Sequence, residues 1–351
     1  MAKLIAIDLG SHHVKLAVYE GAFGRYQLEQ LIAAPVEQGV EAPPDLSARI
    51  AALRVAVGRL PPAGRPAWVT AWPAERTSLR HLTLPFGERA QVEKVLPFEV
   101  EGLVPFDMED MELRHDILHL APGDSEVLAA VVERAGLQAL LAALAEVGCD
   151  PRSVDIDAAS LSMYATDGVQ AVVDVGHTRT IVSICRDGRL IAGRALDGGG
   201  RDLTLALSRA RGCSLSEAEG RKHRASIGPT GPEASPPDAA AGAATPTAVE
   251  WEDDDHTTPA SPAGGSRNLA AAADATATDH DDGAILREAF LPQLAELRST
   301  LISFEDSLSV EIDEVVLVGG GRALAGLREL LQATLGVPVR MPDPVDDGQG
   351  L

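Results

Sequence analysis

Two short segments of the sequence combine an aspartate with a glycine turn in a pattern that can bind a phosphate. One contains Asp8 and Gly10, the other Asp174 and Gly176, and each follows a run of buried-strand residues. A glycine lets the backbone approach a phosphate closely, and successive N–H groups then form an anion-binding concavity. The carboxylate cannot face the phosphate directly, but it can hold a hydrated Mg²⁺ that does. Two such hairpins facing each other across a cleft would bind a triphosphate from both sides.

The repeated frame around these turns is stronger evidence than either turn alone, because many turns contain Asp-x-Gly. Both IAIDLGSHHVKLAVYEGAFGRYQ and VVDVGHTRTIVSICRDGRLI give a strand, Asp-x-Gly, a polar turn, a second strand, a glycine-containing hairpin and a third strand. The alternative is two unrelated hairpins. A chain that repeats this unit is expected to form two α/β lobes of similar design.

Two further glycine clusters precede expected helices. In the first, EVVLV is followed by GGGRALAGL, whose backbone suits close approach to a flat base or ribose. A dinucleotide-binding fingerprint is rejected there, because it would need a glycine at Leu324 and a second βαβ half after it. The second cluster, Gly198 to Gly200, precedes a helix whose N-terminus would be available to an anion, so Gly199 and Gly200 are candidate ligand-binding residues.

The elements that must position these turns alternate between strands and helices, which indicates the α/β class. We expect strands over residues 4–7, 14–19, 26–32, 77–84, 112–120, 126–132, 171–175, 180–185, 190–195 and 314–318. We expect helices over residues 46–57, 88–103, 137–147, 203–211, 214–221, 284–308 and 324–335.

Charge and composition exclude several classes of function. The 351 residues include 30 basic and 52 acidic ones, a net charge of -22, which repels phosphate backbones and anionic lipids. Nucleic-acid binding is therefore not expected. Residues 226–282 hold 11 acidic residues and one basic one amid Pro, Gly, Ala and Thr, and we expect a disordered insertion there. Trp251 within it is either part of a short docking motif or part of a solvated linker.

The remaining reactive side chains suggest no other chemistry. Cys149, Cys185 and Cys213 show no ligand spacing and are expected to be reduced thiols of a cytosolic protein. His115 and His119 lack a third ligand, so a surface pair is expected rather than a metal site. No stretch approaches the roughly 18 to 20 apolar residues that span a bilayer, so direct membrane insertion is not expected.

The order of IDLGS, VDVGHT, GG-x-x-LT, EAEGRK and VVLVGGGRAL resembles the actin-like ATPase superfamily of actin, Hsp70 and FtsA. The run VEKVLPFEVEGLVPFDMEDMELRHDIL narrows the resemblance to the PilM proteins of type IV pilus assembly and the GspL proteins of type II secretion. The resemblance implies an actin-like two-lobe fold with a small inserted α+β subdomain. The implied division is 1–75 for the first lobe, 76–150 for the inserted SHS2-like subdomain, 151–225 for the second lobe, 226–282 for the insertion and 283–351 for the rest of the second lobe.

The resemblance also implies ATP and Mg²⁺ as cofactors and assigns residues to each part of the nucleotide. The first phosphate turn would comprise Asp8, Gly10, Ser11 and Lys15, and the second Asp174, Gly176 and Thr178, with Asp8 and Asp174 holding Mg²⁺ through water. The ribose would contact Glu219 and Lys222, which are otherwise an exposed helical ion pair, and the adenosine would contact Gly319, Gly320 and Gly321. Histidines at 12, 13 and 177 replace the small residues usual in these turns, and their rings would crowd the phosphates.

The function implied by the resemblance is that of an ATP-binding cytoplasmic scaffold. It would lie on the inner membrane through a partner and couple the membrane components of a pilus or secretion platform to the assembly ATPase. The partner would be the short N-terminal tail of a PilN-like membrane protein, and residues 85–86 and 104–106 would either line its groove or belong to the core.

Two alternatives are a working ATPase and a sugar kinase of the same superfamily. Hydrolysis needs a residue that orients the attacking water, and no such residue is evident between the two turns. We therefore expect nucleotide binding rather than efficient hydrolysis.

Overall fold

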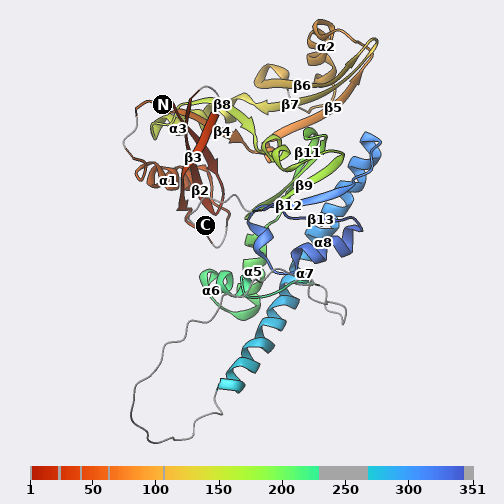
Figure 1. The fold of residues 1–351 in the computed structure, drawn as a ribbon. Helices are drawn as coiled ribbons and strands as arrows, with labels where there is room; N and C mark the ends of the chain where they lie inside the picture. The colour runs from red at the N-terminus through yellow and green to blue at the C-terminus, as the bar shows by residue number, and fades with distance from the viewer. Residues whose placement is uncertain are drawn as a thin grey trace, which may run out of the picture.

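The computed structural model describes residues 2–22, 25–39, 42–61, 64–105, 107–228 and 268–343, and these form three β-sheets (Figure 1). The first sheet has the strand order β3-β2-β1-β4-β8. Its strands are β1 (Ala2–Leu9), β2 (His13–Ala22), β3 (Arg25–Pro35), β4 (Ala67–Trp72) and β8 (Pro151–Ile156). The second sheet has the order β11-β10-β9-β12-β13. Its strands are β9 (Val169–Val175), β10 (Arg179–Arg186), β11 (Arg189–Asp197), β12 (Glu314–Val318) and β13 (Val339–Arg340).

The two five-stranded sheets share one topology. In each, three consecutive strands form an antiparallel meander. A later strand pairs in parallel with the first strand of that meander, and a second later strand pairs in parallel with that added strand. The expected repetition of a strand–turn–strand unit in two similar lobes is therefore confirmed. The two turn glycines also have equivalent surroundings, because each is close to the carbonyl oxygen three residues later. A Cβ on Gly10 would lie 2.5 Å from the His13 carbonyl oxygen, and one on Gly176 would lie 2.8 Å from that of Arg179.

Burial on both faces explains the apolar run of residues 171–173 in the middle of β9. Val172 and Val173 point to opposite faces of the second sheet, and both are completely buried. A strand whose two faces are covered has no solvent side and loses the alternation of apolar and polar residues. The strand therefore holds the turn at its end, residues 176–178, on a rigid support.

A third, antiparallel sheet has the order β5-β7-β6, with strands β5 (Thr77–Leu84), β6 (Met111–Ala121) and β7 (Asp124–Glu133). Helix α2 (Arg89–Glu101) covers it with the buried side chains Val92, Leu96 and Val100. The sheet contacts the second lobe through polar bonds, because Arg189 of β11 donates to the Ile117 and Leu118 carbonyl oxygens of β6.

The other helices connect the strands of the two five-stranded sheets. They are α1 (Leu46–Val57), α3 (Arg134–Glu146), α4 (Asp157–Ser160), α5 (Gly200–Arg211), α6 (Leu215–Lys222), α7 (Asn268–Leu308) and α8 (Leu327–Leu335). Short 3₁₀ turns are η1 (Ala74–Arg76), η2 (Met108–Asp110), η3 (Leu161–Tyr164) and η4 (Gly320–Ala323). Among the helices of the described residues, none is both long enough and apolar enough to cross a membrane.

The placement of α3 and β8 differs from the boundary expected at residue 150. Strand β8 pairs in parallel with β4 of the first sheet, and Leu140 and Leu144 of α3 lie in the core of that sheet. Parallel strands need a long crossover connection, and here it runs through the third sheet and α3. Residues 134–156 thus pack with the first lobe rather than with the inserted subdomain or the second lobe. The division into domains otherwise remains a prediction.

Helix α7 begins earlier than expected. We expected a disordered insertion over 226–282 and a helix from residue 284, whereas α7 starts at Asn268, and it runs past α5 and α6 in Figure 1. At the other end of the expected insertion, Ser226 forms a bridge with Ala325. Residues 229–267, with Trp251, lie outside the described residues.

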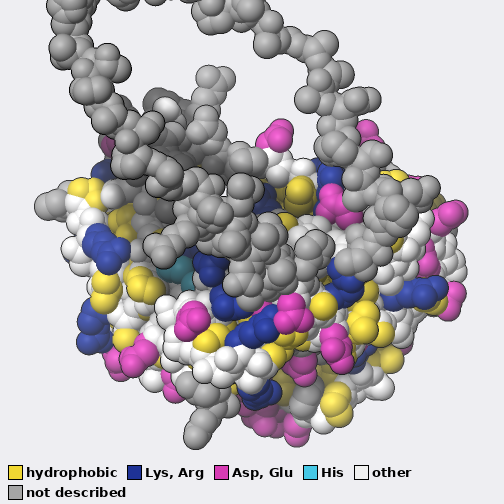
Figure 2. All heavy atoms as spheres, turned by 90° about the horizontal axis from the view of Figure 1, so that it is seen from below, with side chains coloured by type: hydrophobic (Ala, Val, Ile, Leu, Met, Phe, Trp, Pro, Cys, Tyr) yellow, Lys and Arg dark blue, Asp and Glu magenta, His cyan; other side chains and the backbone are white. Residues whose placement is uncertain are grey.

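A buried aspartate fixes α7 to the preceding helices. The carboxylate of Asp282 is completely buried and accepts hydrogen bonds from Arg211 Nε at 2.7 Å and Arg221 Nε at 2.8 Å. Its neighbour Asp281 also pairs with Arg211 but is largely exposed. Basic and acidic side chains of the described residues also lie next to each other across the face of the molecule shown in Figure 2.

Replacing Asp282 with alanine should lower the free energy of unfolding by about 2 kcal/mol, because two arginines lose a buried, hydrogen-bonded partner. The matched variant Asp281→Ala removes an exposed partner and should have a much smaller effect. Urea unfolding followed by circular dichroism would measure both changes. Equal losses in the two variants would contradict the anchoring role of Asp282.

Candidate functional site

The first Asp-x-Gly turn joins β1 to β2. Asp8 and Lys15 are directly opposite each other in the antiparallel pair, and Lys15 Nζ lies 3.2 Å from Asp8 Oδ2. Both side chains are more than half exposed. The structure therefore places two of the predicted residues, a carboxylate and an ammonium group, side by side at the turn end of strands β1 and β2. Both groups are accessible to a ligand there.

The second Asp-x-Gly turn is tied to the downstream glycine cluster. Asp174 pairs in parallel with Val318, the last residue of β12, so Gly319 follows at its side. Gly319 has a φ of +82°, and a Cβ there would overlap the Asp174 carboxylate. Only glycine suits both the left-handed backbone and this close approach. Two candidate segments 145 residues apart in sequence therefore form one site.

Asp174 lies in an environment that disfavours its charge. Burial, together with the nearby negative charge of Asp8, raises the pKa of Asp174 to about 6, although Lys15 opposes the shift. Two carboxylates that repel each other at the ends of neighbouring hairpins are a donor set that a hydrated divalent cation would stabilise. The residues present therefore fit Mg²⁺ by their chemistry.

The two turns touch each other across the lobes. Thr178 Oγ1 donates to Ser11 Oγ at 3.0 Å, and a 2.9 Å hydrogen bond joins His177 Nε2 to Gln38 Oε1. The ring centroids of His12 and His177 are 4.6 Å apart, edge to face. The structure thus brings Ser11 and Thr178 together as the paired-hairpin prediction requires, and a phosphate between them would have to displace these contacts.

Gly199 and Gly200 do not offer a free helix N-terminus, contrary to our expectation. Helix α5 begins at Gly200, and the N–H groups of Gly200 and Arg201 donate to the carbonyl oxygens of Gly176 and His177 at 2.9 and 2.7 Å. The Gly199 N–H donates to Asp202 Oδ2 at 3.0 Å. The start of α5 therefore supports the second Asp-x-Gly turn through these hydrogen bonds, and its first N–H groups are not free to contact an anion.

Lys222 is buried, so it does not form the exposed helical ion pair considered as an alternative. The residue is 7% exposed, and its Nζ donates to Glu219 Oε2 at 2.8 Å, to Thr204 Oγ1 at 2.9 Å and to the Gly200 carbonyl oxygen at 3.0 Å. These bonds use all three ammonium protons. Burial would raise the pKa of Glu219, but the hydrogen bonds from Lys222 and Thr204 outweigh it and lower that pKa. Lys222 thus ties α6 to the start of α5.

Gly320 and Gly321 form the start of the 3₁₀ turn η4, and α8 begins at Leu327, three residues later than expected. A Cβ on Gly321 would overlap the side chain of Val175, whereas one on Gly320 would meet open space. Within the glycine cluster, Gly321 thus packs tightly against β9, whereas Gly320 remains accessible.

Asp157 is a residue that the sequence analysis missed. It follows β8, and its Oδ1 accepts the N–H groups of Ala74 at 2.8 Å and Ala158 at 2.7 Å. Burial, the charge of Glu75 and, more weakly, that of Asp174 raise the pKa of Asp157 to about 7. The available signal was an aspartate directly after a strand, but the strand itself was not predicted.

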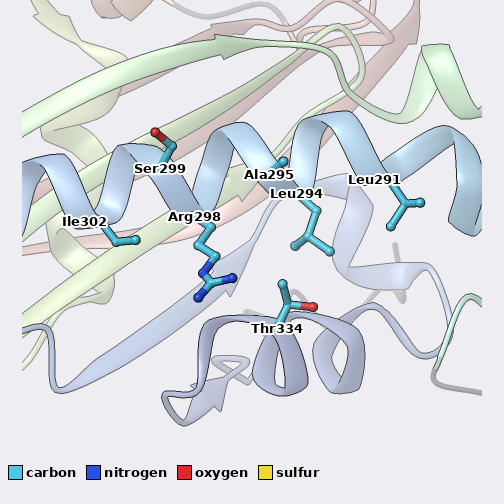
Figure 3. A pocket seen from close by; sticks show the side chains of 7 residues that line it. All are labelled: Leu291, Leu294, Ala295, Arg298, Ser299, Ile302 and Thr334. Atoms are coloured by element: carbon cyan, nitrogen blue, oxygen red, sulfur yellow. The ribbon is translucent and has the colours of Figure 1, made fainter.

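The described surface also contains a groove away from these turns. It has a volume of about 450 Å³ and lies between α7 and α8 (Figure 3). None of the residues predicted to bind the nucleotide lines it. Its lining residues are Leu291, Leu294, Ala295, Arg298, Ser299, Ile302 and Thr334.

Comparison with solved structures identifies the fold. The PilM–PilN type IV pilus biogenesis complex matches at a TM-score of 0.67 with 21% identity, over 98% of this chain and 88% of that one. The MamK double helical filament matches at 0.52 with 12% identity, over 99% and 96% of the two chains. MreB5 of Spiroplasma citri bound to ADP matches at 0.51 with 12% identity, over 98% and 92%. The chain therefore has the actin-like ATPase fold, as the resemblance implied.

A family model described as type IV pilus assembly protein PilM matches residues 6–231. The match covers both Asp-x-Gly turns, the third sheet and helices α5 and α6, which is more than half of the chain. The chain belongs to the PilM family of type IV pilus assembly proteins.

Proposed function

We propose that this chain binds ATP with Mg²⁺ between its two Asp-x-Gly turns and acts as a cytoplasmic scaffold of a type IV pilus assembly platform. The observation that carries the nucleotide part is that Asp174 and Gly319 meet at the ends of the neighbouring strands β9 and β12, with Asp8 of the other lobe close enough for its charge to act on Asp174. MreB5 of Spiroplasma citri, whose solved structure is bound to ADP, shares this fold. Family membership favours the pilus over the secretion system.

The proposal assigns a part of the nucleotide to each group. Asp8 and Asp174 would hold hydrated Mg²⁺, which neutralises phosphate charge. The turns with Gly10, Ser11 and Lys15 and with Gly176 and Thr178 would face the phosphates, and the cluster of Gly319, Gly320 and Gly321 would face the adenosine. Glu219 would contact the ribose, while Lys222 holds Glu219 and the α5 start in place.

The partner part of the proposal rests on the similarity to the PilM–PilN complex. A short N-terminal tail of a PilN-like membrane protein would bring this chain to the inner membrane, and the platform would then contact the assembly ATPase. The residues expected to line the groove divide into two sets. Val104 is buried in the core of the third sheet and Phe86 packs against that core, whereas Pro85 and Pro105 are exposed, as is the adjacent Leu103, which was not among the expected residues. Phe106 lies outside the described residues.

Asp174→Asn should weaken the binding of Mg-ATP at least about tenfold, because the variant loses a charge that the cation would neutralise. Isothermal titration calorimetry would measure the affinity. The matched control is Asp155→Asn, an exposed aspartate on β8, which should leave the affinity unchanged. Absence of binding to the wild type at millimolar nucleotide would overturn the nucleotide part of the proposal.

Asp157 favours the second candidate function, genuine turnover of ATP. A carboxyl group with a pKa near 7 can exchange a proton at neutral pH, and Asp157 lies close enough to Asp174 to be affected by its charge. If the protein hydrolyses ATP, Asp157→Asn should reduce phosphate release by 100-fold or more, about the usual worth of a general base, and leave Mg-ATP affinity within about twofold. A wild type without measurable phosphate release would restrict the function to binding.

Leu103→Ser should weaken binding of the synthetic N-terminal tail of the PilN-like protein from the same genome about tenfold, since Leu103 is 47% exposed beside the expected groove. Ile302→Ser on α7 is the matched control, with the same 47% exposure on another lobe. Fluorescence anisotropy with a labelled tail would compare them. Equal affinities of Leu103→Ser and wild type would place the tail elsewhere on the surface.

A further inference from the structure

Three histidines meet where the two turns contact each other. His12 and His13 belong to the first turn, and their Nδ1 atoms are 2.7 Å apart. His177 belongs to the second turn, and its ring packs edge to face on His12. Such a short Nδ1–Nδ1 contact is a hydrogen bond only if one nitrogen carries a proton and the other does not. In this histidine cluster (His12, His13 and His177), the contact therefore requires a proton on Nδ1 of His12 or of His13, but not on both.

The surroundings disfavour a proton on each ring of the histidine cluster. Burial lowers the pKa of all three rings, that of His177 to about 4, and repulsion from neighbouring groups adds to the effect. The charges of Lys222 and Glu219 on α6 act on both His12 and His177. His223 also acts on His12, and Arg201 of α5 also acts on His177. The ring of His13 is near Lys15 of β2. Of these described charged groups, Glu219 is the one that favours a proton on the cluster, and its Oε2 already accepts a hydrogen bond from Lys222.

The two lysines near the turns are already paired. Lys15 pairs with Asp8, and the three ammonium protons of Lys222 are donated to Glu219, Thr204 and Gly200. The chain as a whole carries a net charge of -22. A polyphosphate entering between the turns thus meets a negative protein whose nearby lysines have their own partners. Imidazole rings can supply additional positive charge there by accepting protons.

We propose that the histidine cluster recognises the phosphates of the nucleotide by becoming protonated when they bind. This inference rests on the proposed binding of ATP between the turns. A bound polyphosphate replaces the ring–ring contact with N–H donors facing anionic oxygens, and such charge-assisted bonds favour the imidazolium form. Histidine, which we expected only to crowd the phosphates, then becomes their ligand.

The sign of the pH dependence follows from linkage. Phosphate binding raises the pKa of the cluster, so the complex binds more protons than the free protein at any pH between the two pKa values. Affinity therefore increases as pH falls through that window and becomes independent of pH above the pKa of the complex. An average uptake of about half a proton between pH 8 and pH 6 corresponds to about a tenfold gain in affinity.

Calorimetry on the full chain can test this directly. Mg-ATP is titrated at pH 7 in PIPES and in Tris, whose heats of ionisation differ, so that the difference in observed heat gives the number of protons bound. The same experiment with His12→Asn and His177→Asn should show a reduced uptake, and His115→Asn, exposed on the third sheet, should match the wild type. Protons exchanged by ATP itself are common to all variants and cancel in the comparison.

The outcomes separate this inference from the proposed function. Binding with a proton uptake that is unchanged in both His12→Asn and His177→Asn would overturn the inference and leave nucleotide binding intact. No binding at any pH would instead overturn the proposed function. If one variant fails to unfold cooperatively, His13→Asn and the wild-type affinity between pH 6 and pH 8 still decide, and a flat wild-type profile would contradict the inference.

Discussion

Two backbone hydrogen bonds hold the second turn in place, and the geometry of the candidate site depends on them. The carbonyl oxygens of Gly176 and His177 accept the N–H groups of Gly200 and Arg201 at the start of α5. A Cβ at Gly199 would come within 2.7 Å of both oxygens, so the close approach needs a residue without a side chain. This contact fixes the direction in which residues 176–178 face the first lobe.

The support of this turn extends to α6 through one buried lysine. Lys222 donates hydrogen bonds both to the Gly200 carbonyl oxygen and to Glu219, the residue proposed to contact the ribose. Since Gly200 also bonds Gly176, Glu219 and the second turn share one hydrogen-bond network. From the turn, His177 and Thr178 continue the network to Gln38 and Ser11 of the first lobe. A shift at α6 therefore has a continuous path to the interface between the lobes, made of bonds that have to rearrange together.

The two hairpins could be predicted because their patterns are local in the sequence. The features that were missed depend on contacts between residues distant in the sequence. Adjacent antiparallel strands with a glycine turn are encoded within about 20 residues, so Asp8 and Asp174 could be placed from the sequence. Strand β8 pairs with a strand about 80 residues away, and no local signal marks it. The family resemblance pointed to Glu219 and Lys222 but could not show that Lys222 is buried against α5. Likewise, Asp282 is surrounded by a polar, acidic sequence, and only its two arginine partners show that it is structural.

The segment between Gly228 and α7 has firm anchors on both sides. Arg287 of α7 bonds the carbonyl oxygens of Ile227 and Gly228, and Asp282 is held by α5 and α6. Lengthening a connection between fixed ends costs little, about 0.6 kcal/mol for each doubling of its length. The evolution of this chain could therefore add or remove residues there without disturbing either lobe. For the same reason, the connection between Gly228 and α7 is a suitable place to insert a fluorescent domain that follows the protein in living cells.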